Sequence, residues 1–167
     1  RIPWLLLLMI ASTFTGQIIE GFEAQLAAIA GLTACIPMLM GTGGNAGGQS
    51  SVTVIRGISL GEIEFSHMFK VMWKEIRVAS LCGLTLATIN LLKLMFIDRI
   101  AVDVSLVVST TLIATVVIAK LIGCILPLFA EKIKLDPAVM ASPFITTIVD
   151  ALSLVIYFQI ATSILPI

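Results

Sequence analysis

One carboxylate stands alone in an apolar segment near the C-terminal end of the sequence. Asp150 belongs to a run, residues 138–167, that contains no other charged side chain. At the rise of an α-helix it lies roughly 10 Å beyond Pro143, seven residues earlier in that run. Placing an ionised side chain at such a depth in an apolar medium costs several kcal/mol of free energy unless an opposite charge neutralises it. We therefore expect Asp150 to bind a cation.

Polar side chains accompany Asp150 along one face of the predicted helix. Steps of four, four, three and four residues place the following on a single stripe: Ser142, Thr146, Asp150, Ser153 and Tyr157. Oxygen atoms of these kinds suit hard cations, although they do not select one ion. One structural alternative stays open, because Lys120 is a base inside another apolar run and can pair with Asp150.

A second unusual segment is rich in glycine. Residues 41–51 read GTGGNAGGQSS and follow Pro37, which removes a backbone donor. We expect the helix that starts at residue 24 to break or kink between residues 37 and 45. The glycines either expose backbone along a polar path or let two helices approach closely. Asn45 and Gln49 share a helix face and contact either the ion or a neighbouring helix; for Gln49 we favour the helix.

The composition is that of a membrane protein with a single domain. Hydrophobic residues make up 59% of the 167 residues and charged residues only 12%. Three isolated cysteines predict buried small side chains rather than a zinc site or disulfides. Five apolar runs are expected to span the membrane as helices: residues 3–19, 24–57, 78–97, 104–130 and 137–167. The third helix is expected to start near Ser66. Because the chain starts at Arg1, we expect it to be part of a longer protein.

Charge placement predicts the orientation of these spans. With five spans, seven of the ten basic residues fall on the side of the N-terminus, and two, Lys93 and Arg99, fall on the other. The rule that places Lys and Arg in the cytoplasm therefore puts the N-terminus inside the cell and the C-terminus outside. The zero net charge gives no indication of nucleic-acid binding.

Two stretches of the sequence resemble the MgtE family of magnesium channels. The first is PMLMGTGGNAGGQS, residues 37–50, whose Gly-Gly-Asn-x-Gly-x-Gln core is the more specific part. The second is the C-terminal helix, in which Pro143 precedes Asp150 by seven residues and Leu-Val-Ile-Tyr follows at 154–157. The opening Arg-x-Pro-Trp-Leu also fits, so the resemblance covers residues 1–167, read as a pore domain.

The resemblance implies an all-α integral membrane homodimer with five spans per subunit. The second and fifth spans would line a pore that conducts hydrated Mg2+ through the plasma membrane. It places Asp150 and Thr146 at the metal, with Ser142 where the family often has Asn. It also implies cytosolic regulatory domains in the full-length protein. Further pore or motif positions are Pro143, Ser153, Tyr157, Pro37, Gly43, Gly44, Asn45, Gly47 and Gln49, and Glu20 and Glu23 are candidates for the outer mouth, although acids in a short turn are usually only solvated.

Two other functional classes bear on this expectation. A coupled secondary transporter, driven by H+ or Na+, is the main alternative to a channel, since Asp150 can exchange a bound metal ion for H+ or Na+. An intramembrane enzyme needs a nucleophile with a base, or a His-rich metal site, within the membrane, and the sequence offers neither. His67, in the polar connector between residues 56 and 77, is expected to be a surface residue. We therefore expect a transport protein and no enzymatic activity.

Overall fold

The computed structural model describes residues 2–140 and 142–165, and the side chains at positions 30, 139, 140 and 142 lie outside this description. Every regular element in these ranges is helical. The order is α1 (Ile2–Gly21), α2 (Glu23–Ala28), α3 (Ala30–Ser59), the short 3-10 helix η1 (Phe65–His67), α4 (Met68–Phe96), α5 (Val102–Lys132), the 3-10 helix η2 (Pro137–Met140) and α6 (Ser142–Ile164).

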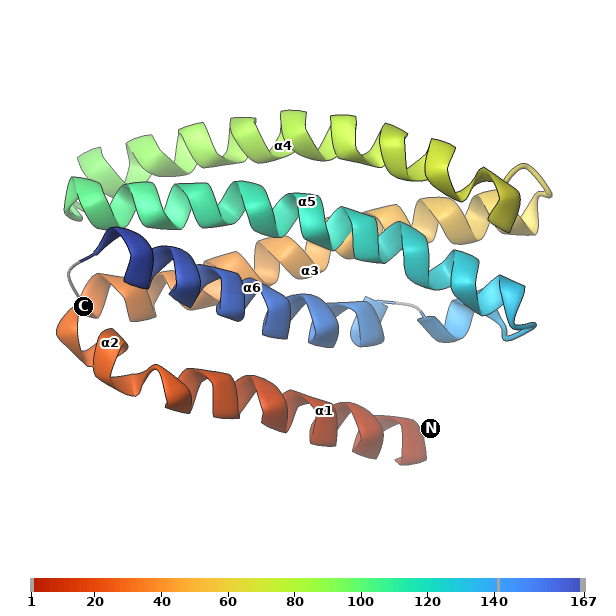
Figure 1. The fold of residues 1–167 in the computed structure, drawn as a ribbon, viewed down its shortest axis with the longest axis horizontal. Coiled ribbons are helices and arrows are strands. Elements are labelled where there is room, and N and C mark those ends of the chain that lie inside the picture. Colours follow the sequence, from red (N-terminus) through yellow and green to blue (C-terminus); the bar gives the residue numbers. More distant parts are fainter. Residues whose placement is uncertain (1, 141, 166–167) are drawn as a thin grey trace.

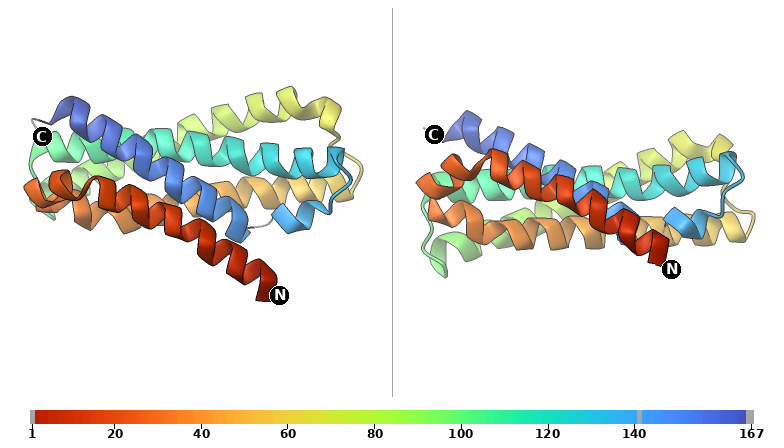
Figure 2. Two further views of the ribbon diagram at one scale, coloured as in Figure 1. Left: turned by 60° about the horizontal axis from the view of Figure 1, so that its bottom comes forward. Right: turned by 90° about the horizontal axis from the view of Figure 1, so that it is seen from below.

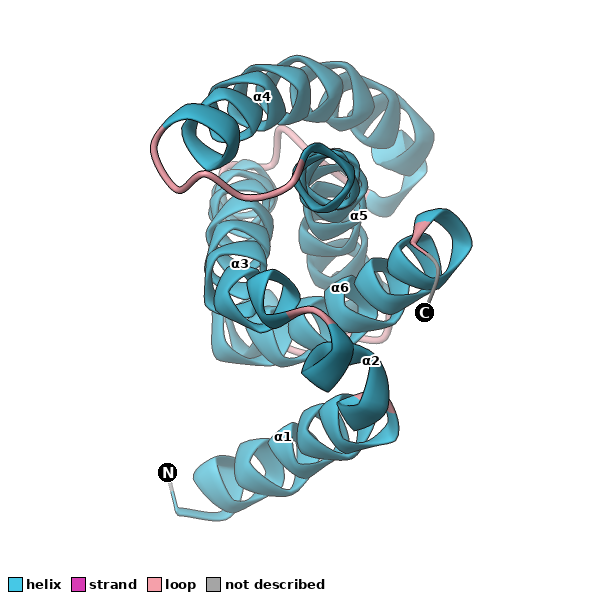
Figure 3. Cartoon of the chain, turned by 90° about the vertical axis from the view of Figure 1, so that its left-hand side faces the viewer, coloured by secondary structure: helices cyan, strands magenta, loops and turns pink. Residues whose placement is uncertain are grey.

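Successive long helices are antiparallel, and α5 lies at the centre of the bundle (Figure 1). α5 packs against α3, α4 and α6, and α3 packs in turn against α6 (Figure 3). α1 packs mainly on α6 and diverges from the bundle toward its N-terminal end (Figure 2). Consequently α1 buries only Thr15, whereas α5 buries side chains along its whole length.

Within the described residues, four helical segments are long and apolar enough to cross a membrane. They are Ile2–Gly21, Phe65–Phe96, Val102–Lys132 and Pro143–Ile164. Their outward faces carry large apolar side chains, among them Leu5, Phe14 and Leu81, which are 62%, 61% and 71% exposed. Such faces are stable against lipid but not against water. The described chain is therefore a multi-pass all-α membrane protein.

The position of the break in the second apolar run differs from our expectation. α3 is assigned as one α-helix from Ala30 to Ser59 and contains Pro37 and the whole glycine-rich segment. The interruption lies earlier, at Ile29, whose φ of −136° and ψ of 96° are extended and separate α2 from α3. A break between residues 37 and 45 is therefore wrong, whereas a kink there stays a prediction. The helix survives there because its glycines are packed between two neighbouring helices.

These glycines provide close contacts to α5 and α6. A Cβ atom at Gly43 would lie 2.7 Å from Thr115 Cγ2 on α5 and 2.8 Å from Val149 Cγ1 on α6. At Gly47 it would lie 2.9 Å from Ile145 Cγ2 and 3.0 Å from the Ala119 carbonyl oxygen. Real Cβ atoms are almost never so close to other atoms. Of the two interpretations of the segment, close helix packing accounts for these positions.

The tightest of these contacts yields a stability prediction. A Cβ at Gly123 of α5 would overlap the carbonyl oxygen of Gly47, which is backbone and cannot rotate away. We expect Gly123→Ala to force α3 and α5 apart and to lower the free energy of unfolding by about 1–3 kcal/mol. Gly41→Ala is the matched control, because nothing lies within 4 Å of its Cβ position. It should leave stability unchanged or raise it by up to about 1 kcal/mol. Unfolding in mixed detergent, followed by circular dichroism, compares the two, and equal stabilities would contradict the close contact.

Candidate functional site

Helix α6 positions the isolated carboxylate. Pro143 sits in the first turn, where a missing N–H costs no helical hydrogen bond, and the uncharged helix continues past Asp150 to Ile164. Ser142 is the first residue of α6, but its side chain lies outside the described part of the structure. Asp150 and Thr146 are both partly buried, one helical turn apart.

The glycines of α3 fix how close Asp150 and Thr146 lie to that helix. Thr146 faces Gly44, where an added Cβ would lie 3.0 Å from the threonine Cγ2. Val149 faces Gly43. The two helices run in opposite directions (Figure 1), so Asp150, the residue after Val149, lies at about the level of Gly43. The carboxylate is thus held next to the glycine-rich half of α3.

No described residue donates a hydrogen bond to the enclosed oxygen of Asp150. Its Oδ1 atom is buried without a partner. The described residues also contain no group of three or more His, Cys, Asp or Glu side chains that could hold a metal. A buried carboxylate oxygen without a hydrogen-bond donor favours the binding of a cation. Within one subunit Asp150 would have to share that cation with water molecules or with oxygen atoms of other kinds.

Lys120 is not the partner of Asp150. Its Nζ atom lies 3.4 Å from Glu75 Oε2 of α4 and 3.3 Å from Ser50 Oγ of α3. Ser50 Oγ in turn donates to Glu75 Oε2 at 2.6 Å. All three residues are buried, so their contacts satisfy both charges inside the subunit. The alternative in which Lys120 neutralises Asp150 is therefore excluded by the geometry.

The polar stripe on α6 divides into two parts. Ser153 is 3% exposed and Tyr157 is fully buried. The Tyr157 hydroxyl donates to the Leu32 carbonyl oxygen on α3 at 2.9 Å, and the next residue, Phe158, stacks on Phe22 with ring centroids 4.3 Å apart. These contacts attach the C-terminal half of α6 to the start of α3 and to the junction of α1 and α2. Of the stripe side chains that the structure describes, Thr146 and Asp150 remain partly accessible.

A groove on α3 begins beside Thr146. It has a volume of about 600 Å³ and is lined by Gly44, Asn45, Gly48, Gln49, Val52 and Thr53. Gly44 is both part of this lining and the contact of Thr146. The side chains of Asn45 and Gln49 are exposed, as is Pro37 about two turns before Asn45. The structure therefore brings the exposed part of the glycine-rich segment next to the accessible part of α6.

The acidic residues Glu20 and Glu23 lie away from this groove. Glu20 is near the end of α1 and Glu23 starts α2, and both are exposed. They occupy the end of the bundle that also holds the α4–α5 connection and the end of α6 (Figure 1). The six described basic residues of the other group lie at the opposite end: Arg56, Lys70, Lys74, Arg77, Lys132 and Lys134.

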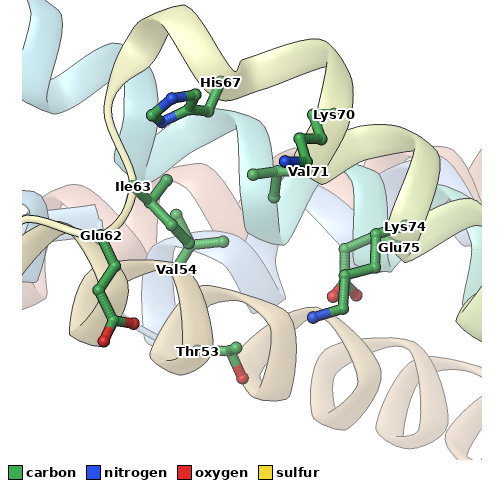
Figure 4. A pocket seen from close by; sticks show the side chains of 9 residues that line it. All are labelled: Thr53, Val54, Glu62, Ile63, His67, Lys70, Val71, Lys74 and Glu75. Carbon is green, nitrogen blue, oxygen red and sulfur yellow. The ribbon is translucent and has the colours of Figure 1, made fainter.

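A second cavity lies between α3 and α4 at the basic end of the molecule (Figure 4). Its volume is about 220 Å³, and its lining includes Lys70, Lys74 and Glu75 from α4 and Glu62 from the loop before it. His67 also lines it and is exposed, as the sequence suggested. The His67 Nδ1 atom accepts a hydrogen bond from the Glu64 backbone N–H at 3.2 Å, which closes the turn into α4.

Together, the helical fold and the isolated carboxylate define a multi-pass membrane protein with a candidate cation site. A model of the MgtE family, described as a divalent cation transporter, matches residues 36–160. The chain is 35% identical over 167 residues to the magnesium transporter MgtE of Bacillus subtilis, covering 98% of this chain, and 33% identical over 165 residues to that of Thermus thermophilus, covering 96%. The chain belongs to the MgtE family.

The chain spans about a third of the length of these curated relatives. It covers 36% of the Bacillus subtilis protein and 35% of the Thermus thermophilus protein. A third relative, the magnesium transporter MgtE of Enterococcus faecalis, is 29% identical over 165 residues, which are 97% of this chain and 36% of that protein. The match includes the glycine-rich segment and Asp150, since both lie within residues 36–160.

Proposed function

We propose that this chain is the pore domain of a homodimeric Mg2+ channel in the plasma membrane. The observation that carries the proposal is Asp150, whose enclosed Oδ1 atom has no donor among the described residues. One turn away on the same helix, Thr146 contacts Gly44, which lines the groove on α3. A twofold axis running past α3 and α6 gives two copies of Asp150, one from each subunit. Two carboxylates match the number that typically binds Mg2+.

In this proposal the ion keeps most of its water. Mg2+ loses its hydration shell reluctantly, so Asp150 and Thr146 hold the coordinated waters, and Asn45 on the exposed face of α3 contacts the same shell. Binding through water is strong enough to attract a divalent cation and weak enough to release it. Gly43 and Gly47 act indirectly, because their close contacts hold α3 against α6.

α3 is the fifth membrane span in this arrangement. It has 30 residues, which is about 45 Å of helix, and it packs against α5 and α6 like the other spans. Its glycine and hydroxyl content makes it less apolar than the four spans above, as suits a helix that faces water in a pore. The six described basic residues at one end then orient the N-terminus to the cytoplasm and the C-terminus outward, with Glu20 and Glu23 near the outer mouth.

Relatives that are almost three times as long suggest further domains in the full-length protein. We propose that these domains are cytosolic and regulate the pore. The basic end of the bundle is where they would meet it.

Mg2+ flux into vesicles tests the function and separates a channel from a coupled transporter. We expect the chain, reconstituted in vesicles that contain a Mg2+-sensitive dye, to admit Mg2+ down its own gradient when pH and Na+ are equal on both sides. Single-channel currents carried by Mg2+ should accompany this flux. Flux that appears only with a pH or Na+ gradient would identify the coupled transporter instead. Vesicles without protein provide the background rate.

A further inference from the structure

We propose that the basic end of α4 binds an anionic phospholipid in the adjoining leaflet. The site joins two hollows. The first is the 220 Å³ cavity in Figure 4, to which α4 contributes Lys70 and Lys74. The second is a surface groove of about 240 Å³ lined by Lys74, Arg77, Val78 and Leu81. Lys74 lines both, so the two hollows adjoin at this residue, with Lys70 on one side and the apolar side chains of Val78 and Leu81 on the other.

The charges at this site are not neutralised within the subunit. Lys70, Lys74 and Arg77 form no ion pair in the part of the chain that the structure describes. Two acids line the cavity, but Glu75 is already bound to Lys120 and Ser50, and Glu62 comes from the loop on the side away from the two lysines (Figure 4). Three cations against one available acid leave an excess of positive charge.

The helix end itself already has an acidic cap. Glu64 caps the 3-10 helix η1, which runs directly into α4, and its side chain accepts a hydrogen bond from the His67 backbone. The first turn of α4 contains no acidic residue, so no acid on that turn offsets Lys70. A bound phosphate group would supply negative charge to the lysines.

The apolar half of the site favours a lipid over a free anion or an acidic protein. Val78 and Leu81, one and two turns further into the membrane span, are 40% and 71% exposed. They lie where an acyl chain would run from a headgroup at Lys74. Trp73, 63% exposed, is three residues after Lys70 and four before Arg77, so it shares their face. An exposed Trp at this level is typical of the headgroup region of a membrane.

Trp73 also provides a direct reporter for the lipid. The chain has two tryptophans, Trp4 and Trp73, so Trp4→Phe leaves one fluorophore beside the proposed site. Brominated phospholipids quench it on contact. The chain is reconstituted in mixtures of brominated and unbrominated phosphatidylglycerol or phosphatidylcholine, which gives the relative association constant of the two headgroups.

We expect phosphatidylglycerol to be preferred about fivefold to twentyfold over phosphatidylcholine, since each basic residue near an anionic surface strengthens association about fivefold. Lys70→Gln/Lys74→Gln should bring the ratio close to one, and 1 M salt should reduce it. Arg99→Gln, in the connection that follows the other end of α4, removes a positive charge far from the site and should leave the ratio unchanged. Equal quenching by both lipids would overturn the proposal and assign the cations to an acidic protein surface. A preference that survives the double substitution would overturn the location.

Discussion

Asp150→Asn is expected to reduce Mg2+ flux at least about 100-fold. Two unit charges 4 Å apart attract by about 4 kcal/mol at an effective dielectric constant of ~20, and the substitution removes one such carboxylate from each subunit of the proposed dimer. An amide of nearly the same shape fits the space beside α3 that Asp150 occupies, so the fold should persist. Asp150→Ala should have the same effect on flux for the same reason.

Two controls keep this result specific. Asp103→Asn makes the same chemical change at an exposed site in the first turn of α5, and it should retain normal flux. Size-exclusion chromatography should show the same dimer for wild type and both variants. If vesicles with Asp150→Asn took up Mg2+ at the normal rate, the charge of this carboxylate would have no part in conduction, and the proposed ion site would have to be abandoned.

The sequence predicts most of the helices because their signals are local. The expected start of the third helix near Ser66 agrees with η1 and α4, and the fourth run, residues 104–130, agrees with α5 to within two residues at each end. Apolar runs bounded by short charged turns are sufficient for this. The isolation of Asp150 in α6 is equally visible in the sequence, because no neighbouring charge obscures it.

What the sequence alone could not give is the pairing between distant residues. Gly123 contacts Gly47, 76 positions earlier, and a single glycine in an apolar helix gives no sign of its partner. Without that contact, Pro37 and the glycines predict a break that the packed helix does not have. The partner of Lys120 was missed in the same way, because Glu75 lies among Lys74, Arg77 and other residues that mark a polar connector.

One signal could have revealed Glu75. On a helix that starts near Ser66, Lys70, Lys74 and Arg77 share one face, while Glu75 is turned about 100° from Lys74. Glu75 is buried, so the acid in this connector that departs from the basic face is the one that enters the bundle. A base buried in an apolar run requires such an acid, and the position of Lys120 on α5 restricts it to the helices that α5 contacts.

The buried pair yields the second large prediction. Lys120→Met leaves the Glu75 carboxylate enclosed with only Ser50 to donate to it, and removal of one partner from a buried ion pair typically costs about 3–5 kcal/mol. We expect a loss of this size in the free energy of unfolding in mixed detergent. Lys120→Met/Glu75→Gln removes both charges together, and should recover about half of the loss or more, which gives a positive coupling in the double-mutant cycle.

The ion pair between Lys93 and Asp98 is the matched control. It tests whether the distance between the charges or their burial determines how much an ion pair contributes to stability. It is shorter, at 2.6 Å against 3.4 Å, but its side chains are 53% and 30% exposed, compared with 8% and 11% for Lys120 and Glu75. If distance governed its contribution, Lys93→Met would be the more damaging substitution. If burial governs it, Lys93→Met costs less than about 1 kcal/mol, and the reverse order of the two lysine variants would refute our assignment. Ser50 is three residues from Gly47, and Lys120 is three residues from Gly123. The buried pair and the close glycine contact therefore stabilise the same interface of α3 and α5. Loss of the buried pair should also loosen α3, the helix that carries Asn45.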